Sequence, residues 1–172
     1  MNNPKLQHAT HALQAVLQQL VGQHSTMLEL LERKRVAIRS HDTRAMTELC
    51  QLENECVKAI SELEKTRLEL VANMTLIVKP DAAEPMRMAE MAEHLPEPAR
   101  GQLLVQRQQM LDKMQQVQAE TQVVRQATDA IMKHMTNLVQ TVTAFSSGVT
   151  TYSAQGAPPQ AKGRVSTFAV TA

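Results

Sequence analysis

The stretch that decides the fold is residues 103–145, LLVQRQQMLDKMQQVQAETQVVRQATDAIMKHMTNLVQTVTAF. An apolar side chain recurs at every seventh residue of this stretch: Leu103, Met110, Val117, Val124, Ile131, Leu138 and Phe145. Such a repeat aligns its members along one stripe of an α-helix. Because Pro98 suits the first turn of that helix and Gly148 suits its C-terminal cap, the pattern predicts one long helix over 98–147.

Two amphipathic segments precede this helix. The first predicts a helix over about 5–39, with apolar residues seven apart at Leu6, Leu13, Leu20 and Met27. The second predicts a helix over 42–77, with its seam at Leu49, Leu52, Cys56, Ala59, Leu63, Leu70 and Ile77. Asp42 is the predicted N-cap of the second helix, because its carboxylate can accept hydrogen bonds from the free backbone N–H groups of the first turn.

The segment between the second and third helices is a predicted connector, residues 78–97. It holds Pro80, Pro85 and Pro96, and proline interrupts a helix because it lacks an N–H and clashes with the preceding turn. Within it, Pro85 can begin a short helix. Residues 149–172 have no helical period and contain several Pro and Gly residues, so they are expected to form a flexible tail.

Together these segments predict an all-α fold, an elongated antiparallel coiled-coil bundle of three long helices with a mobile C-terminal tail. The bundle is expected to occupy residues 1–148. The composition agrees, because the chain has only two Phe, one Tyr and no Trp. A core without aromatic residues must consist of aliphatic side chains and the 11 methionines, as at helix–helix seams.

The charge balance and the apolar runs exclude several classes of protein. A formal net charge of +1 gives no broad electrostatic footprint for nucleic acid. The N-terminal residues contain no signal-peptide core, and no run approaches the roughly 18 apolar residues of a membrane span. Cys50 and Cys56 are six residues apart on one helix and too divergent for a disulfide within it. Buried free thiols, no membrane insertion and a cytoplasmic location are therefore expected.

No pattern for catalysis, a cofactor or a metal emerges. His8 and His11 are three residues apart on a helix, but a metal site needs at least one or two further ligands, which the sequence does not offer nearby. Phosphate-binding loops, nucleophile elbows and metalloprotease helices are also missing from the sequence. The prediction is a protein that binds other proteins and is not an enzyme.

The third helix is expected to be longer than its partners can cover. Its uncovered part would then offer an apolar groove to an incoming amphipathic helix, formed by Val124, Ile131, Met135, Leu138 and Val142. Methionine suits such a groove because its flexible thioether adapts to different partners, and the candidates are Met86, Met88, Met91, Met110, Met114, Met132 and Met135. Simple core packing remains open for each of these residues.

The order of elements resembles the FlgN family of flagellar type III export chaperones. The resemblance rests on the cluster 63–67 (LEKTR) in the second helix, on Leu95-Pro96 before a Gln-rich third helix, and on Tyr152 with Gly156 four residues later. Near the middle of the third helix the sequence departs from the family, reading TDAIM at 128–132 where Asn and paired leucines are common.

The resemblance implies a cytoplasmic chaperone that binds the C-terminal helices of hook-associated junction proteins. It would prevent their premature assembly and deliver them to the flagellar export gate, with Tyr152 and Gly156 docking on the membrane protein of that gate. The alternative is a self-associating structural or adaptor coiled-coil protein, and a weak homodimer is compatible with either function.

Overall fold

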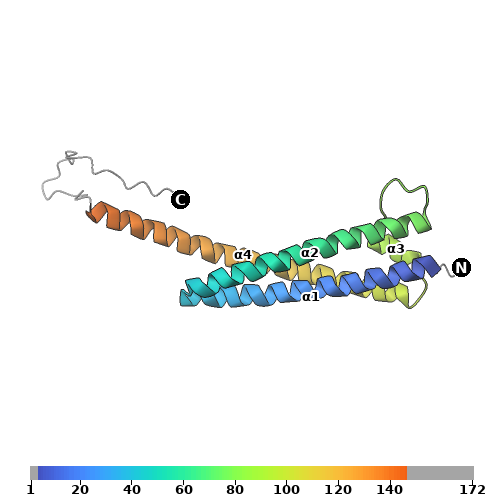
Figure 1. Ribbon diagram of the computed structural model, residues 1–172, viewed down its shortest axis with the longest axis horizontal. Helices are drawn as coiled ribbons and strands as arrows, with labels where there is room; N and C mark the ends of the chain where they lie inside the picture. Colours follow the sequence, from blue (N-terminus) through green and yellow to red (C-terminus); the bar gives the residue numbers. More distant parts are fainter. Residues whose placement is uncertain (1–3, 147–172) are drawn as a thin grey trace. The chain divides into compact units, whose positions relative to one another are not determined.

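The computed structural model describes residues 4–146, whose regular structure is entirely α-helical. The helices are α1 (Pro4–Ser40), α2 (Thr43–Val78), α3 (Met88–Glu93) and α4 (Ala99–Ser146) (Figure 1). The predicted all-α class is thereby confirmed. Within this described range, none of the helices is both long and apolar enough to cross a membrane.

The chain divides into two compact units, residues 1–127 and 128–172. Helices α1, α2 and α3 lie wholly in the first unit. The division falls inside α4, which therefore contributes its first part to one unit and its last part to the other.

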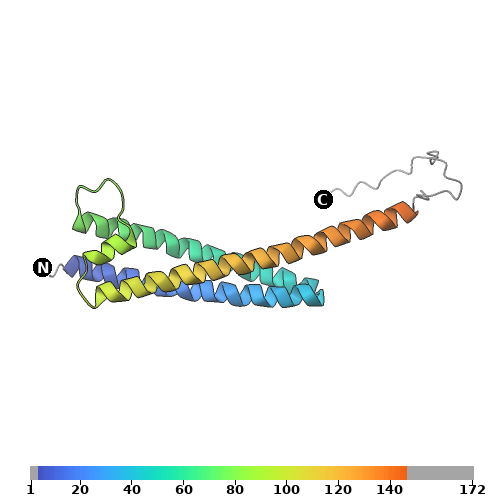
Figure 2. The same cartoon turned by 180° about the vertical axis from the view of Figure 1, so that it is seen from behind.

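Helices α1 and α2 lie side by side in opposite directions (Figures 1 and 2). Between them, His41 adopts a positive φ of 56°. The backbone N–H groups of His41 and Asp42 donate to the carbonyl oxygens of Ile38 and Ala37 at 3.2 and 3.0 Å, which closes the end of α1. Asp42 accepts a hydrogen bond from the backbone N–H of Ala45 at 2.9 Å, so its predicted role as N-cap of α2 is confirmed.

The core of the first unit consists of aliphatic and methionine side chains. Leu13, Leu17 and Leu20 of α1 are fully buried and belong to one cluster with Met74 of α2 and Leu103 of α4. Residues 1–127 contain no Phe, Tyr or Trp, so this unit is stabilised without aromatic packing. Each Å² of apolar surface removed from water contributes about 25 cal/mol, so a long aliphatic seam can replace a few large rings.

Helix α3 and its neighbouring segments close one end of the first unit. Met91 and Ala92 of α3 are fully buried in the same cluster. The backbone N–H of Met86 donates to Thr75 Oγ1 at 3.0 Å, and that hydroxyl donates to the carbonyl oxygen of Val71 at 2.8 Å. The connector between the long helices therefore contains one short helix that packs into the core.

Two polar contacts define the register of the first part of α4 against α1. Gln14 Nε2 donates to Gln102 Oε1 at 3.2 Å, and Arg35 Nη1 lies 3.5 Å from Glu120 Oε2. From the first contact to the second, the residue number increases in both helices, so this part of α4 runs parallel to α1. Counting on from Arg35 and Glu120 at the same rise per residue, the end of α1 at Ser40 corresponds to about residue 125 of α4.

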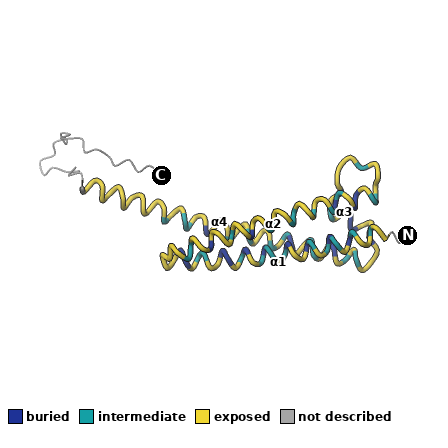
Figure 3. Tube along the Cα trace, in the orientation of Figure 1, coloured by how far each residue is buried: buried dark blue, intermediate teal, exposed yellow. Residues whose placement is uncertain are grey.

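The predicted three-helix coiled-coil bundle is not confirmed. Helix α4 supplies Leu103 and Met110 to the core, and Val124 is also buried. After Val124, the apolar positions of its heptad are partly or largely exposed (Figure 3). In the described part of α4, the apolar seam is therefore not buried along its whole length.

The two cysteines are both free, as predicted, but only one of them is buried. Cys56 is buried on α2, and its thiol donates to the carbonyl oxygen of Gln23 at 3.4 Å. Burial also raises the pKa of the Cys56 thiol, which keeps it protonated. The expected burial of Cys50 is wrong: six residues turn a helix through about 600°, so only one of the two can face α1.

The buried side chain of His24 lacks the hydrogen-bond partners that such groups usually have. His24 is buried within the seam of α1, and neither of its ring nitrogens has a hydrogen-bond partner among the described residues. Burial lowers the pKa of His24, and the nearby Glu64 carboxylate, which acts in the opposite direction, offsets this only in part. The His24 side chain is therefore neutral in the folded chain at pH 7.

We expect Leu17→Ala to lower the free energy of unfolding by about 3 kcal/mol, because it leaves a cavity in the α1–α2 core. Leu68→Ala is the matched control, since Leu68 is exposed on α2, and it should change stability by less than about 0.5 kcal/mol. Urea unfolding followed by far-ultraviolet circular dichroism measures both. Equal losses in the two variants would contradict the assignment of Leu17 to the core.

We expect the protein to lose stability as the pH falls through about 6.5, the ordinary pKa of histidine. The lowered pKa of His24 means that the unfolded chain takes up this proton before the folded chain does, so acid favours unfolding. His24→Leu, which suits the apolar seam, should be more stable than wild type and lose less stability between pH 7.5 and pH 5.5. Urea unfolding at both pH values tests this, and an identical pH dependence in the two proteins would refute it.

Candidate protein-binding face of helix α4

The described part of the second unit is the last stretch of α4, residues 128–146. Its heptad positions form a seam along one side of the helix, which we call the first seam: Ile131, Met135, Leu138, Val142 and Phe145. Ile131 is partly exposed, whereas Met135, Leu138, Val142 and Phe145 are 54, 47, 66 and 89% exposed. Exposed large apolar side chains in contiguous positions are typical of surfaces that bind another protein.

The five residues predicted to form a groove therefore differ in their accessibility. Val124 is buried in the first unit, so it contributes to the chain's own core. Ile131, Met135, Leu138 and Val142 belong to the second unit and form most of the first seam. Phe145, the most exposed of the large apolar residues in the described range, continues this seam and was identified in the sequence only as a heptad position.

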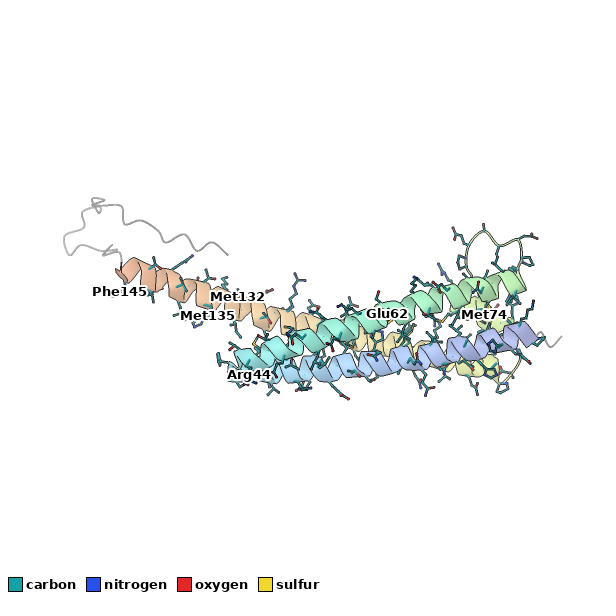
Figure 4. All side chains as sticks on the ribbon, viewed as in Figure 1. Arg44, Glu62, Met74, Met132, Met135 and Phe145 are labelled. Carbon is teal, nitrogen blue, oxygen red and sulfur yellow. The ribbon has the colours of Figure 1, made fainter. Side chains whose placement is uncertain are left out.

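The candidate methionines separate in the same way. Met86, Met91 and Met110 are buried, and Met88 packs against their cluster, so these four belong to the core. Met114 is 41% exposed in the first unit. Met132 and Met135 are exposed near the beginning of the second unit (Figure 4). Sequence alone left core packing and binding equally open for each of them; burial assigns Met86, Met88, Met91 and Met110 to the core, and binding stays a prediction for the exposed ones.

The register of the first unit determines where the pairing of α1 with α4 ends. The pairing of Arg35 with Glu120 leaves α1 only five more residues, up to Ser40. Helix α2 begins at Thr43, on the other side of the same turn. At this register the pairing of α1 with α4 therefore ends at about residue 125, close to the end of the first unit.

Most of the first seam, from Met135 onward, is flanked by uncharged residues. Residues 135–146 contain no Asp, Glu, Lys or Arg, and the nearest charged side chains are those of Asp129 and Lys133. The hydroxyl groups of Thr136, Thr141 and Thr143 donate to the carbonyl oxygens four residues earlier, at 2.9, 2.9 and 2.7 Å. These hydroxyls are satisfied within the helix, so the threonines can contact a partner through their methyl groups.

A cavity of about 430 Å³ in the first unit lies between the beginning of α1 and the connector that precedes α4. Its ionisable lining residues are His11, His94 and Glu97. Throughout residues 4–146, no group of three or more His, Cys, Asp or Glu side chains is arranged to hold a metal ion. In the part of the chain that the structure describes, the face of α4 is therefore the better candidate for a functional site.

The predicted docking residues Tyr152 and Gly156 lie outside the described residues, as does the predicted flexible tail over 149–172. The similarity to known proteins extends beyond the described residues. A family model described as FlgN protein matches residues 1–160, a range that includes Tyr152 and Gly156. No curated protein and no solved structure matches the chain.

Proposed function

Because the chain belongs to the FlgN family of flagellar export chaperones, we propose that it binds the C-terminal helical region of hook-associated junction proteins. In this proposal it keeps those proteins from assembling in the cytoplasm and delivers them to the type III export gate. The observation that carries the proposal is the exposed first seam of α4.

The chemistry of the first seam suits a helical guest. An amphipathic helix can lay its apolar face along Met135, Leu138 and Val142 and remove both surfaces from water. Fully burying one such side chain contributes about 1.5–3 kcal/mol, which makes a few residues sufficient to determine where the guest binds. A guest whose apolar face is covered in this way cannot use that face for polymerisation.

Release of the guest requires no covalent chemistry in this arrangement. An interface built from apolar contacts is reversible, and its lifetime depends on how much surface is buried and on how well the residues pack. Met132 and Met135 favour such exchange because an unbranched thioether adapts to differently shaped neighbours. The same face could therefore accept more than one guest of similar chemistry.

We assign docking on the membrane protein of the export gate to Tyr152 and Gly156. Support comes from the family match, which extends through both residues, and from their spacing. A tyrosine offers a partner a large apolar ring together with a hydroxyl group that can donate or accept a hydrogen bond. Separate segments for guest and gate would allow both to be bound at once.

Self-association through the same seam is the alternative function. The lack of charge over 135–146 means that two copies would not repel one another there. The mass of the purified chain in solution separates the two functions, because a structural coiled-coil protein would form a stable tetramer or filament. A monomer or a weak dimer that captures a helical guest would favour the chaperone.

We expect Leu138→Glu to abolish co-purification with a hook-associated protein, because the guest would bury an unpaired carboxylate. Val57→Glu places the same charge at a 54% exposed position of α2 and should leave binding unchanged. Circular dichroism and urea unfolding should show wild-type helicity and stability for both variants. Capture of the guest by a folded Leu138→Glu variant would rule out this face as the binding site.

We expect Tyr152→Ala to retain wild-type affinity for the hook-associated protein and to lose binding to the soluble domain of the export-gate membrane protein. The reason is that the ring that contacts the gate is removed while α4 is unchanged. Surface plasmon resonance with each partner measures the two affinities separately. Unchanged binding to the gate domain would show that the docking role belongs to other residues.

A further inference from the structure

We propose that the last turns of α4 bind two helices of the guest side by side, so that α4 becomes the third helix of a mixed three-helix assembly. This inference rests on the proposed function and names the form of the guest: a pair of apolar helices with uncharged flanks. It arises from a second apolar seam on α4 next to the first.

The second seam is displaced by one residue from the first: Met132, Thr136, Val139 and Thr143. Its members repeat at four, three and four residues, the spacing of a helix–helix seam. Met132 and Val139 are each 61% exposed, and Thr136 and Thr143 are also exposed (Figure 4 labels Met132). The second seam is therefore as accessible as the first.

Together the two seams are too broad for one partner helix. Successive residues are about 100° apart around the helix axis. On that basis Phe145 marks one edge of the two seams and Thr136 the other, and the arc between them, which includes Leu138, is roughly half of the circumference of α4. A helix that packs on a core by one side typically has an apolar stripe of about 100°. A single guest helix on the first seam would therefore leave Met132 and Val139 exposed, whereas a pair of helices covers both seams.

The threonines of the second seam can be buried without a polar penalty. Thr136 Oγ1 donates to the carbonyl oxygen of Met132 at 2.9 Å, and Thr143 Oγ1 donates to that of Val139 at 2.7 Å. A buried hydroxyl group costs free energy when it has no hydrogen-bond partner, but these two have partners in their own helix. A guest helix then meets methyl groups at both positions.

The absence of charge determines the chemistry of the guest. Helix pairs are often selected by charged residues beside the seam, and residues 135–146 offer none. Charged flanks on a guest would find no counter-charge here, so the complementary surface is apolar with uncharged polar edges. Exposed apolar residues elsewhere in the chain can have charged neighbours. Leu68 of α2, for example, is exposed and lies between Arg67 and Glu69 in the sequence.

Three consecutive residues of α4 provide a matched test. Leu138 lies on the first seam, Val139 on the second and Gln140 on the polar side, so the same substitution samples three directions around one turn. Leu138→Lys and Val139→Lys should each weaken binding of a purified full-length hook-associated protein by at least tenfold. Gln140→Lys should bind within twofold of wild type. Isothermal titration calorimetry measures the affinities, and all three variants should keep wild-type helicity because the three side chains are exposed.

The possible outcomes are distinct. Wild-type affinity in Val139→Lys together with loss in Leu138→Lys would mean that one guest helix binds, which overturns the two-helix arrangement but leaves the proposed function intact. If wild-type chain binds no hook-associated protein, the proposed function fails and the inference fails with it. The mass of the complex in solution should correspond to one chain and one guest. The wild-type complex could instead contain two copies of this chain, and the Val139→Lys complex one copy with the same affinity for the guest. That result would assign the second seam to self-association and overturn the inference.

Discussion

The packing of α1 against α2 is the interaction on which the rest of the structure depends. Most of the stability of a helix in a protein comes from the packing of its amphipathic face, and α1 and α2, of 37 and 36 residues, bury their seams on each other. Their pairing creates the apolar surface on which Met91 of α3 and Leu103 of α4 are buried. Because α4 has 48 residues, it is longer than the two helices available to cover it.

The two parts of α4 have different properties. Up to Val124, the heptad positions of α4 contribute to the stability of the chain itself. From residue 128 onward the same repeat leaves apolar side chains in contact with water, which is unfavourable for the free protein. In the proposed complex a bound helix would remove this cost, so the exposed face would contribute to the affinity for the guest.

The composition of the last turns of α4 gives the helix little support of its own. Val139, Thr141, Val142 and Thr143 are β-branched, and such residues lose side-chain freedom in a helix. Over 135–146 there are also no oppositely charged pairs that could support the helix. Packing against a guest would therefore stabilise the helix as well as cover its apolar face, which couples the order of this segment to binding.

The sequence by itself determined which residues of each helix share a face, because apolar residues at heptad spacing must lie on one stripe. It also determined the N-cap at Asp42, where a local hydrogen bond is sufficient, and the break at the prolines before α4. The tertiary structure alone decided which parts of that stripe are covered. Val124 and Leu138 occupy equivalent positions of one repeat, and only Val124 is buried. Periodicity specifies the direction of a side chain, whereas burial depends on which side chains from distant parts of the sequence pack against it.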